Sequence, residues 1–488
     1  MKILFPFLIF SLFSSMYAHS TLWKVGPNQL YSKPSQVSGL VQDGDTVEID
    51  EGTYLKDVTR WSKNNLLLRG TGEGAHLNAE QTAYGRKAIW VIAGNNTIVE
   101  NVEFSNCRDQ LNRDKNWAGI RQEGVGLIVR NCFFHNNDNG ILGGGGATSE
   151  LIIEHSEFAY NGYGDGYSHN LYIGNIKSLT FSFNYSHHAK VGHELKSRAA
   201  NNYILYNRIG NEADGTASRE IDLPNGGVAI IIGNQIQQGA LTSNSGMIGY
   251  GLEGLINPAP HQLFLINNTL VNDIQGRGNF VNIKTGTEKY KAYNNIYSGF
   301  GDTLSGNAFV VEAGNNLIIS SAATSGFKNY IEYDYHLVSS SPAIDKGVDP
   351  GKTEEGYELI PDFEYLHPLG KKERIKNVVI DIGAFEFSLP VSSYRSIRNR
   401  PVIGLHVNAY PNPYKDRILF HIESKESGKG TLTLYTLSGE MVQTVYEGYL
   451  FAGEKQVVDF KVPVFNRTNL IYVLNINGIQ HLGKLIKQ

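Results

Sequence analysis

The stretch NCFFHNNDNGILGGGGATSELIIEHSEF (Asn131 to Phe158) contains one unit of a repeat and the beginning of the next. It starts with a short apolar pattern, NCFF, reaches a second one in NGILGGG, and returns to the first in HSEF. Both patterns are too short for helices, and the Gly and Asn residues around them favour turns. The stretch therefore predicts very short strands that are joined by tight corners.

The first pattern recurs between Ile89 and Gly314, with steps of 22 to 34 residues between copies. Self-similarity at such a period indicates a stacked array in which the loops vary in length. The copies are NVEF (Asn101 to Phe104), NCFF (Asn131 to Phe134), HSEF (His155 to Phe158), NYSH (Asn184 to His187), YNRI (Tyr206 to Ile209), GNQI (Gly233 to Ile236), NNTL (Asn267 to Leu270) and NNIY (Asn294 to Tyr297).

A second short strand accompanies each copy, from AIWVIAG (Ala88 to Gly94) to AFVVEAG (Ala308 to Gly314). Short strands that repeat with variable loops predict an all-β fold, a right-handed single-stranded parallel β-helix whose rungs pair with their neighbours around one long core. We expect the recurring Asn residues to stack as an internal ladder at one corner. Their side chains satisfy backbone groups and tolerate left-handed geometry.

The composition agrees with a large β protein. Of the 488 residues, 41% are hydrophobic and 18% are charged, and 43 basic against 47 acidic side chains give a formal charge of -4. This balance excludes a disordered chain and a protein that coats nucleic acid, so we expect no nucleic-acid partner. Two cysteines, Cys107 and Cys132, cannot build a disulfide framework, which leaves either one bridge or two buried thiols.

The two ends of the repeat resemble a known class. WKVGPNQLYSKPSQVSGLVQDGDTVEIDEGTY (Trp23 to Tyr54) resembles the N-terminal cap and first coil of right-handed β-helix proteins of the pectate-lyase-like class. SPAIDKG (Ser341 to Gly347) and DIGAFEF (Asp381 to Phe387) resemble the segment that follows such helices. The resemblance implies a β-helix over 21–335, a C-terminal segment over 336–388, and a polysaccharide as the substrate class.

The chain beyond the repeat predicts export from the cell. Residues 1–20 have the charged start, apolar middle and small-residue end of a signal peptide. A polar, Pro-containing stretch over 389–405 predicts a linker, and alternating strand patterns over 406–488 predict a small β-sandwich. Its YPNP start (Tyr410 to Pro413) and LYTLSGEMV hairpin (Leu434 to Val442) resemble the C-terminal sorting domain of the type IX secretion system.

This second resemblance implies that residues 406–488 bind the type IX secretion machinery, and that the protein is then secreted or attached to the cell surface. No apolar run reaches the roughly 20 residues that a membrane-spanning helix needs, so we expect no integral membrane segment. We expect the protein to be a monomer.

Alignment of the second strand family predicts one polar outer face. We take one apolar residue of each strand as inward, from Ile120 to Val281, so that its neighbours point outward. Successive rungs lie about 4.8 Å apart. Arg121 lies in the same column, and three adjacent rungs then gather Asn170, Tyr172, Glu194, Lys196, Arg198, Glu220 and Asp222.

These residue types suit β-elimination on a uronic-acid polysaccharide. Lys196 is the predicted base, Arg198 holds the substrate carboxylate, and Tyr172 or His193 gives a proton to the leaving oxygen. This division of labour resembles that of calcium-dependent β-helix polysaccharide lyases. We expect Ca²⁺ to be held by Asn170, Glu194, Glu220 and Asp222, and substrate to be bound by Arg121, His169, His187 and His188.

Three alternatives remain open from the sequence. A hydrolase would use a carboxylate pair, either Glu194 with Glu220 or Glu220 with Asp222. A non-catalytic surface adhesin or glycan binder would need only the ladder and its exposed Tyr and Asn residues. The charged cluster would also arise as a set of solvated ion pairs without function.

Overall fold

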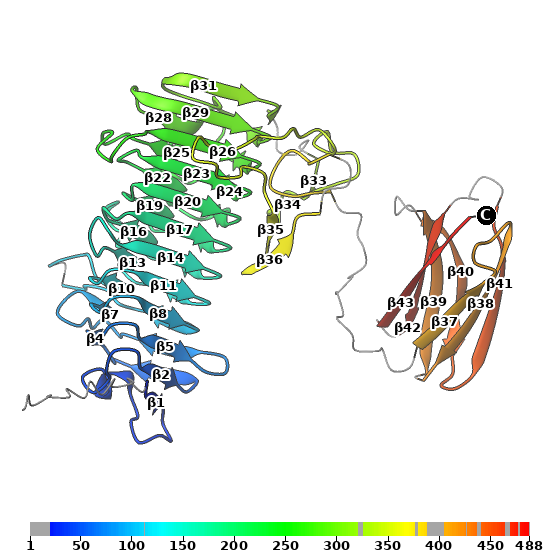
Figure 1. The fold of residues 1–488 in the computed structure, drawn as a ribbon, viewed down its shortest axis with the longest axis horizontal. Coiled ribbons are helices and arrows are strands. Elements are labelled where there is room, and N and C mark those ends of the chain that lie inside the picture. The colour runs from blue at the N-terminus through cyan, green and yellow to red at the C-terminus, as the bar shows by residue number, and fades with distance from the viewer. Residues whose placement is uncertain are drawn as a thin grey trace, which may run out of the picture. The chain divides into compact units, whose positions relative to one another are not determined.

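The computed structural model describes residues 20–111, 113–320, 326–375, 379–387, 405–425, 427–436, 441–463, 469–476 and 479–487. The chain divides into two compact units, Met1–Phe387 and Ser388–Gln488 (Figure 1). Except for Ser20 and Leu405, the predicted signal peptide (1–20) and the predicted linker (389–405) lie outside the described residues.

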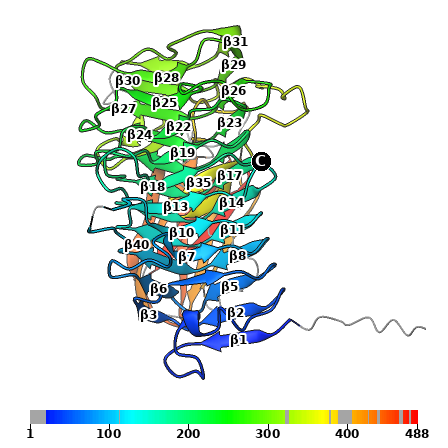
Figure 2. The ribbon, with the colours of Figure 1, turned by 90° about the vertical axis from the view of Figure 1, so that its left-hand side faces the viewer.

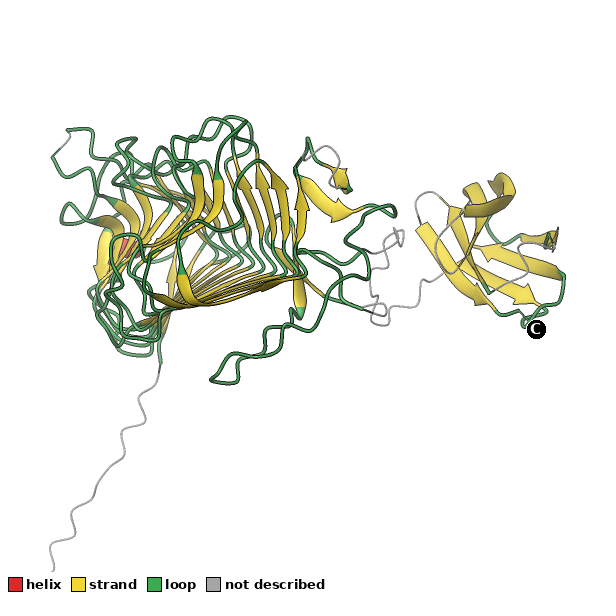
Figure 3. Cartoon of the chain, turned by 90° about the horizontal axis from the view of Figure 1, so that it is seen from above, coloured by secondary structure: helices red, strands yellow, loops and turns green. Residues whose placement is uncertain are grey.

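Three parallel sheets build the first unit. In the described residues sheet A has 12 strands, sheet B has 11 and sheet C has nine. Each coil of the chain runs from sheet C through sheet A to sheet B, and each strand pairs in parallel with the equivalent strand of the next coil. The coils lie over one another when seen from above (Figure 3), and the strands of sheet C rise one above the other (Figure 2). The prediction of a parallel β-helix is confirmed.

The strands are named here by sheet. Sheet A contains β1 (Leu22–Val25), β2 (Thr46–Ile49), β5 (Leu67–Gly70), β8 (Thr97–Glu100), β11 (Leu127–Arg130), β14 (Glu150–Glu154), β17 (Ser178–Ser182), β20 (Asn201–Leu205), β23 (Val228–Ile232), β26 (Gln262–Ile266), β29 (Thr287–Tyr293) and β31 (Ala308–Gly314). Sheet B contains β3 (Gly52–Leu55), β6 (Ala75–Asn78), β9 (Val102–Ser105), β12 (Phe133–His135), β15 (Glu157–Ala159), β18 (Tyr185–His187), β21 (Arg208–Gly210), β24 (Gln235–Gln238), β27 (Thr269–Asn272), β30 (Ile296–Gly299) and β32 (Leu317–Ile319). Sheet C contains β4 (Thr59–Trp61), β7 (Ala88–Ile92), β10 (Ala118–Gln122), β13 (Asn139–Gly143), β16 (Leu171–Ile173), β19 (Leu195–Ser197), β22 (Ile221–Leu223), β25 (Gly246–Tyr250) and β28 (Asn279–Ile283).

One apolar core runs along the inside of the coils. In strands such as β8 and β11 of sheet A, alternation buries every second residue. In sheet B the rings of Phe104, Phe134 and Phe158 stack with centroids 4.9 Å apart from one rung to the next. Cys107 and Cys132 are buried in this core as free thiols, so no bridge joins them.

The corner between sheets A and B is held by asparagines, as predicted. The Asn207 side-chain amide donates to the Phe181 carbonyl (2.8 Å) and to Asn234 Oδ1 (2.9 Å), and Asn207 Oδ1 accepts from the Asn184 backbone N–H (2.9 Å). The residue before each asparagine takes a left-handed backbone, with φ of 55° at Tyr206. The same hydrogen-bond pattern links Asn184, Asn207, Asn234, Asn268, Asn295 and Asn316.

The chain then packs back along the β-helix. After β32 it forms two antiparallel pairs, β33 (Phe327–Asn329) with β34 (Asp334–Leu337) and β35 (Phe363–Leu366) with β36 (Gly370–Glu373). The Asn267 side chain donates to the Asp381 carbonyl (2.9 Å), and the buried Arg374 pairs with the buried Glu386 (2.6 Å). The segment 326–387 is therefore part of the first unit.

The second unit is a small antiparallel sandwich. One sheet contains β37 (Leu405–Tyr410), β38 (Arg417–Ser424) and β41 (Lys455–Lys461). The other contains β39 (Gly428–Thr436), β40 (Met441–Leu450), β42 (Leu470–Ile476) and β43 (Ile479–Leu485). Residues of both sheets, such as Phe420 and Leu432, share one apolar core. Four residues of the predicted hairpin (437–440) lie outside the described residues.

Helical structure is nearly absent from the described residues. The element η1 (Pro34–Gln36) is a single 3₁₀ turn of three residues near the start of the β-helix. Among all the described residues, no helix is long or apolar enough to cross a membrane.

Candidate functional site

A ladder of side chains runs along the outer face of sheet C. Tyr172 of β16 pairs with Lys196 of β19, which pairs with Asp222 of β22. Tyr172 is half-buried, whereas Lys196 and Asp222 are buried. The outward direction predicted for these three residues agrees with the structure. We call Tyr172, Lys196, Arg198, Asp222 and Glu253 the sheet C cluster.

Asn170, Glu194 and Glu220 do not lie on this outer face, so that part of the prediction is wrong. Each stands one position before the first residue of its strand, and all three side chains are fully buried. Alternation applies within a strand, but at the corner that leads into sheet C two successive side chains turn inward. Of the four predicted calcium ligands, only Asp222 lies on the outer face, so these residues do not fit an open calcium site.

Glu194 is bound inside the corner. Its Oε1 accepts from the Ala189 backbone N–H (2.9 Å), and its Oε2 accepts from Asn170 Nδ2 (2.5 Å) and Ser186 Oγ (3.1 Å). Burial nevertheless dominates and raises the pKa of Glu194 to about 8. The Glu194 carboxyl group therefore belongs to the interior architecture.

Glu220 lies in a similar position one rung further on. Its Oε1 accepts from Asn211 Nδ2 (2.8 Å), while its Oε2 has no hydrogen-bond partner among the described residues. Burial raises the pKa of Glu220 well above its usual range, and the neighbouring Glu194 adds to the rise. With Glu194 and Glu220 enclosed, neither carboxylate pair predicted for hydrolysis forms on the outer face.

Two cations of the sheet C cluster share one carboxylate. Lys196 Nζ lies 2.7 Å from Glu253 Oε1 and 3.3 Å from Asp222 Oδ2. Arg198 Nη2 lies 2.5 Å from Glu253 Oε2, so Glu253 bridges the two cations. The Glu253 side chain is 46% exposed, whereas that of Lys196 is 11% exposed. The solvent side of the cation pair is therefore occupied by a single, accessible carboxylate.

Arg198 also orients the phenol of Tyr172. Arg198 Nε donates to Tyr172 OH (3.0 Å), and Arg198 Nη1 donates to Asn225 Oδ1 (2.7 Å). The Arg198 guanidinium lies 5.7 Å from the centre of the Tyr172 ring, and Lys196 Nζ lies 5.9 Å from it. The phenol and the two cations thus form one group of contacts.

Two histidines beside the cluster are held neutral in a fixed tautomer. His169 Nδ1 accepts from the His193 backbone N–H (2.9 Å), and His193 Nδ1 accepts from the Arg219 backbone N–H (3.2 Å). Each ring therefore carries its proton on Nε2. Burial lowers the pKa of His193 to about 3 and that of His169 well below its usual range. The rings stack at 4.9 Å, and His193 Nε2 lies 3.6 Å from Asp222 Oδ2.

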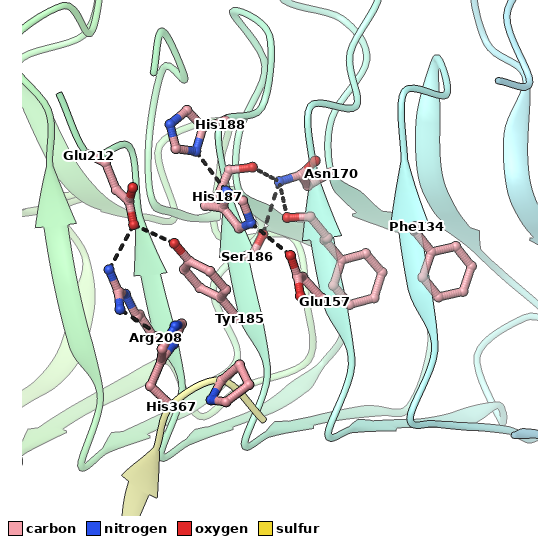
Figure 4. A network of polar contacts seen from close by, with 12 residues as sticks. Phe134, Glu157, Asn170, Tyr185, Ser186, His187, His188, Arg208, Glu212 and His367 are labelled. Carbon is pink, nitrogen blue, oxygen red and sulfur yellow. Dashed lines mark hydrogen bonds and ion pairs between the residues drawn. The ribbon is translucent and has the colours of Figure 1, made fainter. Parts of the chain in front are cut away.

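His187 and His188 do not join this site, which corrects their predicted place beside it. His187 ends β18 in sheet B, on the other side of the corner from Lys196. Its Nε2 contacts Glu157 Oε1 (3.2 Å), and its Nδ1 contacts His188 Nδ1 (2.6 Å) (Figure 4). His188 Nε2 in turn contacts Asp214 Oδ1 (3.0 Å). The chain leaves sheet B after His187 and enters sheet C only at Leu195, so His187 and His188 lie on the sheet B side of the corner.

The neighbouring groups of sheet B satisfy one another. The Tyr185 hydroxyl donates to Glu212, which also pairs with Arg208 (2.7 Å) (Figure 4). His367, from the segment that packs back, lies against the Tyr185 ring with centroids 5.2 Å apart. Burial is the main cause that raises the pKa of Tyr185. This network is one of the contacts that join the C-terminal segment to sheet B, beside the hydrogen bond from Gln235 Nε2 to the Tyr333 carbonyl (2.9 Å).

Sequence reasoning missed three residues of the site, and it placed with the site a fourth residue, Arg121, that the structure sets apart. Glu253 follows β25, 57 positions after Lys196, so the strand alignment contained no signal for it. Asn225 and Arg219 flank β22, and Arg219 Nε lies 3.8 Å from Asp222 Oδ1. Arg121 lies in the same column as Tyr172 but is separated from it by Leu142, and it therefore stands apart from the cluster.

Comparison with known proteins concerns the fold. No family model matches the chain, and no curated protein matches it. The crystal structure of pectate lyase Pel9A aligns with a TM-score of 0.40 at 14% identity, over 76% of this chain and 97% of that one. The structure of the PL6 family alginate lyase AlyGC aligns with a TM-score of 0.25 at 14% identity, over 68% of this chain and 58% of that one. The parallel β-solenoid itself is shown by the three parallel sheets of the first unit.

Proposed function

We propose that the protein is a polysaccharide lyase that cleaves uronic-acid glycans by β-elimination at the sheet C cluster. The observation that carries the proposal is the pair Lys196 and Arg198, which shares one accessible carboxylate beside the phenol of Tyr172. A cation to neutralise a uronate, a base and an acid are the groups that this reaction needs.

The Glu253 carboxylate marks the place of the substrate carboxylate in this proposal. It bridges Lys196 and Arg198 from the solvent side, and its side chain is 46% exposed. A uronate that displaces Glu253 keeps a carboxylate against Arg198, which presents a planar pair of donors to it. Strands of sheet C continue along the β-helix on both sides of the cluster, from β13 towards β4 and from β25 to β28 (Figure 2).

The proposed step transfers two protons. Lys196 first releases its ammonium proton to the solvent, and the neutral amine then takes the proton from the carbon next to the substrate carboxylate. Arg198 stabilises the charge that develops on that carboxylate. A carbon–carbon double bond forms as the bond to the leaving oxygen breaks. The Tyr172 hydroxyl gives its proton to that oxygen, and its contact with Arg198 Nε (3.0 Å) holds it beside the reacting sugar.

His169 and His193 have a supporting part in the proposal. Because their pKa values are lowered, both rings stay neutral at neutral pH and offer an Nε2–H donor without adding charge. Neutral donors of this kind suit the hydroxyl groups of a sugar. We therefore assign His169 and His193 to substrate binding. Tyr172 keeps the role of the acid that protonates the leaving oxygen.

The hydrolase alternative is weakened by the burial of Glu194 and Glu220, whereas a glycan binder remains the outcome to be tested. The full chain is mixed with a panel of uronic-acid polysaccharides, with calcium and with a chelator, because calcium dependence stays a prediction. We expect the ultraviolet absorbance of unsaturated uronide ends to grow. New reducing ends without that absorbance would indicate a hydrolase, and silence in both assays would indicate a binder.

We further propose that residues 406–488 direct secretion through the type IX machinery. The two-sheet sandwich and its YPNP start support this proposal. The test compares the full chain with a chain that ends at Phe387, both produced in a bacterium that has this machinery. We expect the shortened chain to stay inside the outer membrane, and equal export of both chains would contradict the proposal.

A further inference from the structure

A second cluster of ionisable side chains lies on the outer face of sheet B, in the first third of the β-helix. It contains His76 of β6, Glu103 of β9 and His135 of β12, which belong to three successive rungs. His76 pairs with Glu103 in the parallel register, and His135 stands two positions after Phe133, the partner of Glu103. All three side chains therefore leave the same face of sheet B, apart from the sheet C cluster.

The three side chains converge on one point. Glu103 Oε1 lies 3.1 Å from His76 Nε2 and 2.8 Å from His135 Nε2, and one ligand atom from each residue lies within 4.8 Å of the others. Four ligands at about 2.0–2.1 Å around a tetrahedral zinc ion stand roughly 3.3 Å apart, close to the two distances from Glu103 Oε1 to the imidazole nitrogens. The side chains are 18% to 36% exposed, so an ion reaches them from solvent.

The donor set identifies the class of ion. Two imidazole nitrogens and one carboxylate oxygen suit a borderline divalent transition metal, whereas Ca²⁺ and Mg²⁺ prefer oxygen ligands alone. We propose that His76, Glu103 and His135 form a binding site for Zn²⁺. With three protein ligands, the fourth position stays open to water or to a small ligand. At the edge of the proposed site, Ser105 Oγ lies 2.7 Å from His76 Nε2.

The surroundings of His135 suit a ligand. Its ring stacks on that of Phe133 with centroids 4.4 Å apart, which fixes the direction of Nε2. Asn136 Nδ2 lies 2.9 Å from His135 Nδ1. When the Asn136 amide is turned over, its oxygen accepts from Nδ1–H and leaves the Nε2 lone pair for the metal. Zinc then replaces the protons that join the imidazoles to Glu103 in the metal-free state.

The test uses the full-length chain without a histidine tag, stripped with a chelator and titrated with Zn²⁺ in a calorimeter. We expect one tight equivalent of Zn²⁺, and we expect Glu103→Gln and His135→Ala each to weaken it by at least about 100-fold. His421→Ala is the matched control, because His421 is exposed on β38 of the second unit, and it should bind like the parent.

Glu103→Gln keeps the size and the hydrogen bonds of the side chain, so it separates loss of a ligand from loss of the fold. Its circular dichroism should match that of the parent. Substitution with Co²⁺ adds a second readout, since bound Co²⁺ absorbs visible light with an intensity that depends on its coordination. The proposal would be overturned if the parent binds no tight equivalent of Zn²⁺, or if both ligand variants bind Zn²⁺ as tightly as the parent.

Discussion

Lys196 has the contacts of a residue that is held in place for chemistry. Its ammonium lies between Asp222 Oδ2 (3.3 Å) and Glu253 Oε1 (2.7 Å), and only 11% of its side chain is exposed. Lys177, which directly precedes β17 of sheet A, makes a comparable ion pair with Glu150, but its side chain is 60% exposed. The two lysines therefore form a matched pair for separating position from charge.

We expect Lys196→Ala to lower the rate of double-bond formation by at least about 10²-fold, because a positioned base is lost. Lys177→Ala, the control, should leave the rate unchanged. The measurement is the ultraviolet absorbance rate of each variant on a polysaccharide that the parent cleaves. Full activity of the Lys196 variant, with unchanged circular dichroism, would contradict the assignment of the base.

Glu194 makes stability depend on pH. Its pKa is raised to about 8 in the folded state, so between about pH 5 and pH 8 the folded protein keeps a proton that the unfolded chain has released. The free energy of unfolding therefore falls as pH rises through this window, by at most about 1.4 kcal/mol per pH unit from this group. The decline ends above about pH 8, where both states are ionised.

We expect Glu194→Gln to flatten this decline, because glutamine keeps neutral hydrogen bonds to Ser186 and Asn170 and has no proton to lose. The measurement is the unfolding midpoint of the β-helix at several pH values. Glu150→Gln, at an exposed carboxylate, is the control and should follow the parent. Parallel curves for the parent and the Glu194 variant would show that Glu194 does not cause the decline.

At this scale the sequence predicted some directions correctly and missed others for a physical reason. Tyr172, Lys196 and Asp222 lie inside strands, where alternation holds. Asn170 and Glu194 precede their strands, and the backbone of a corner does not alternate. The prediction extended the alternation of the strand to the residue before it. It therefore placed Asn170 and Glu194 on the outer face, whereas both side chains are buried.

The loop after β25 is the element that completes the sheet C cluster. Gly251 and Gly254 bracket it with φ of 70° and 130°, and Glu253 between them reaches Lys196 and Arg198. Gly251 is further confined because an added Cβ would lie 2.5 Å from Leu255 Cδ2. These backbone angles hold the Glu253 carboxylate over the cation pair.

We expect Glu253→Gln to lower KM for an anionic polysaccharide several-fold, because the substrate no longer competes with a fixed carboxylate and the cluster becomes more positive. The effect should shrink at high salt. Glu123→Gln is the control, since Glu123 pairs with Arg60 elsewhere on sheet C. A large fall in kcat with unchanged KM would instead make Glu253 a catalytic group.

The asparagine ladder is the element that holds the sheet A to sheet B corner. Asn207 lies in its middle, fully buried, whereas Asn316 is its partly buried end. We expect Asn207→Ala to lower the free energy of unfolding by about 3 kcal/mol, because it leaves buried donors and acceptors unpaired. Asn316→Ala should cost clearly less in the same urea titration. Equal losses at both positions would contradict the ladder as a source of stability.

Elements were predictable to the extent that they repeat. The NCFF-type blocks predicted the strands of sheet B and the asparagine corner because each copy reports the same local geometry. The Glu253 loop occurs once, and its contacts reach back two rungs, so no repeat contains them. The metal ligands His76, Glu103 and His135 also come from three different rungs, with no spacing that a motif would show.

The repeated coils of the first unit place side chains at regular intervals along one axis. Its parallel ladders bring residues tens of positions apart into register, and they give each outer face a different set of groups. Sheet C presents Lys196 and Arg198, and sheet B presents the proposed zinc site. One solenoid therefore carries two chemically distinct surfaces, and only the residue types on each surface indicate what it does.

The most direct test of the lyase proposal is the mass of the products. The full chain is incubated with the most reactive polysaccharide of the panel, and the oligosaccharides are weighed by mass spectrometry beside those of Lys196→Ala. We predict products that are one water lighter than hydrolysis products, and their loss in the variant. Products of full hydrolytic mass, or light products made equally by the variant, would contradict β-elimination at the sheet C cluster.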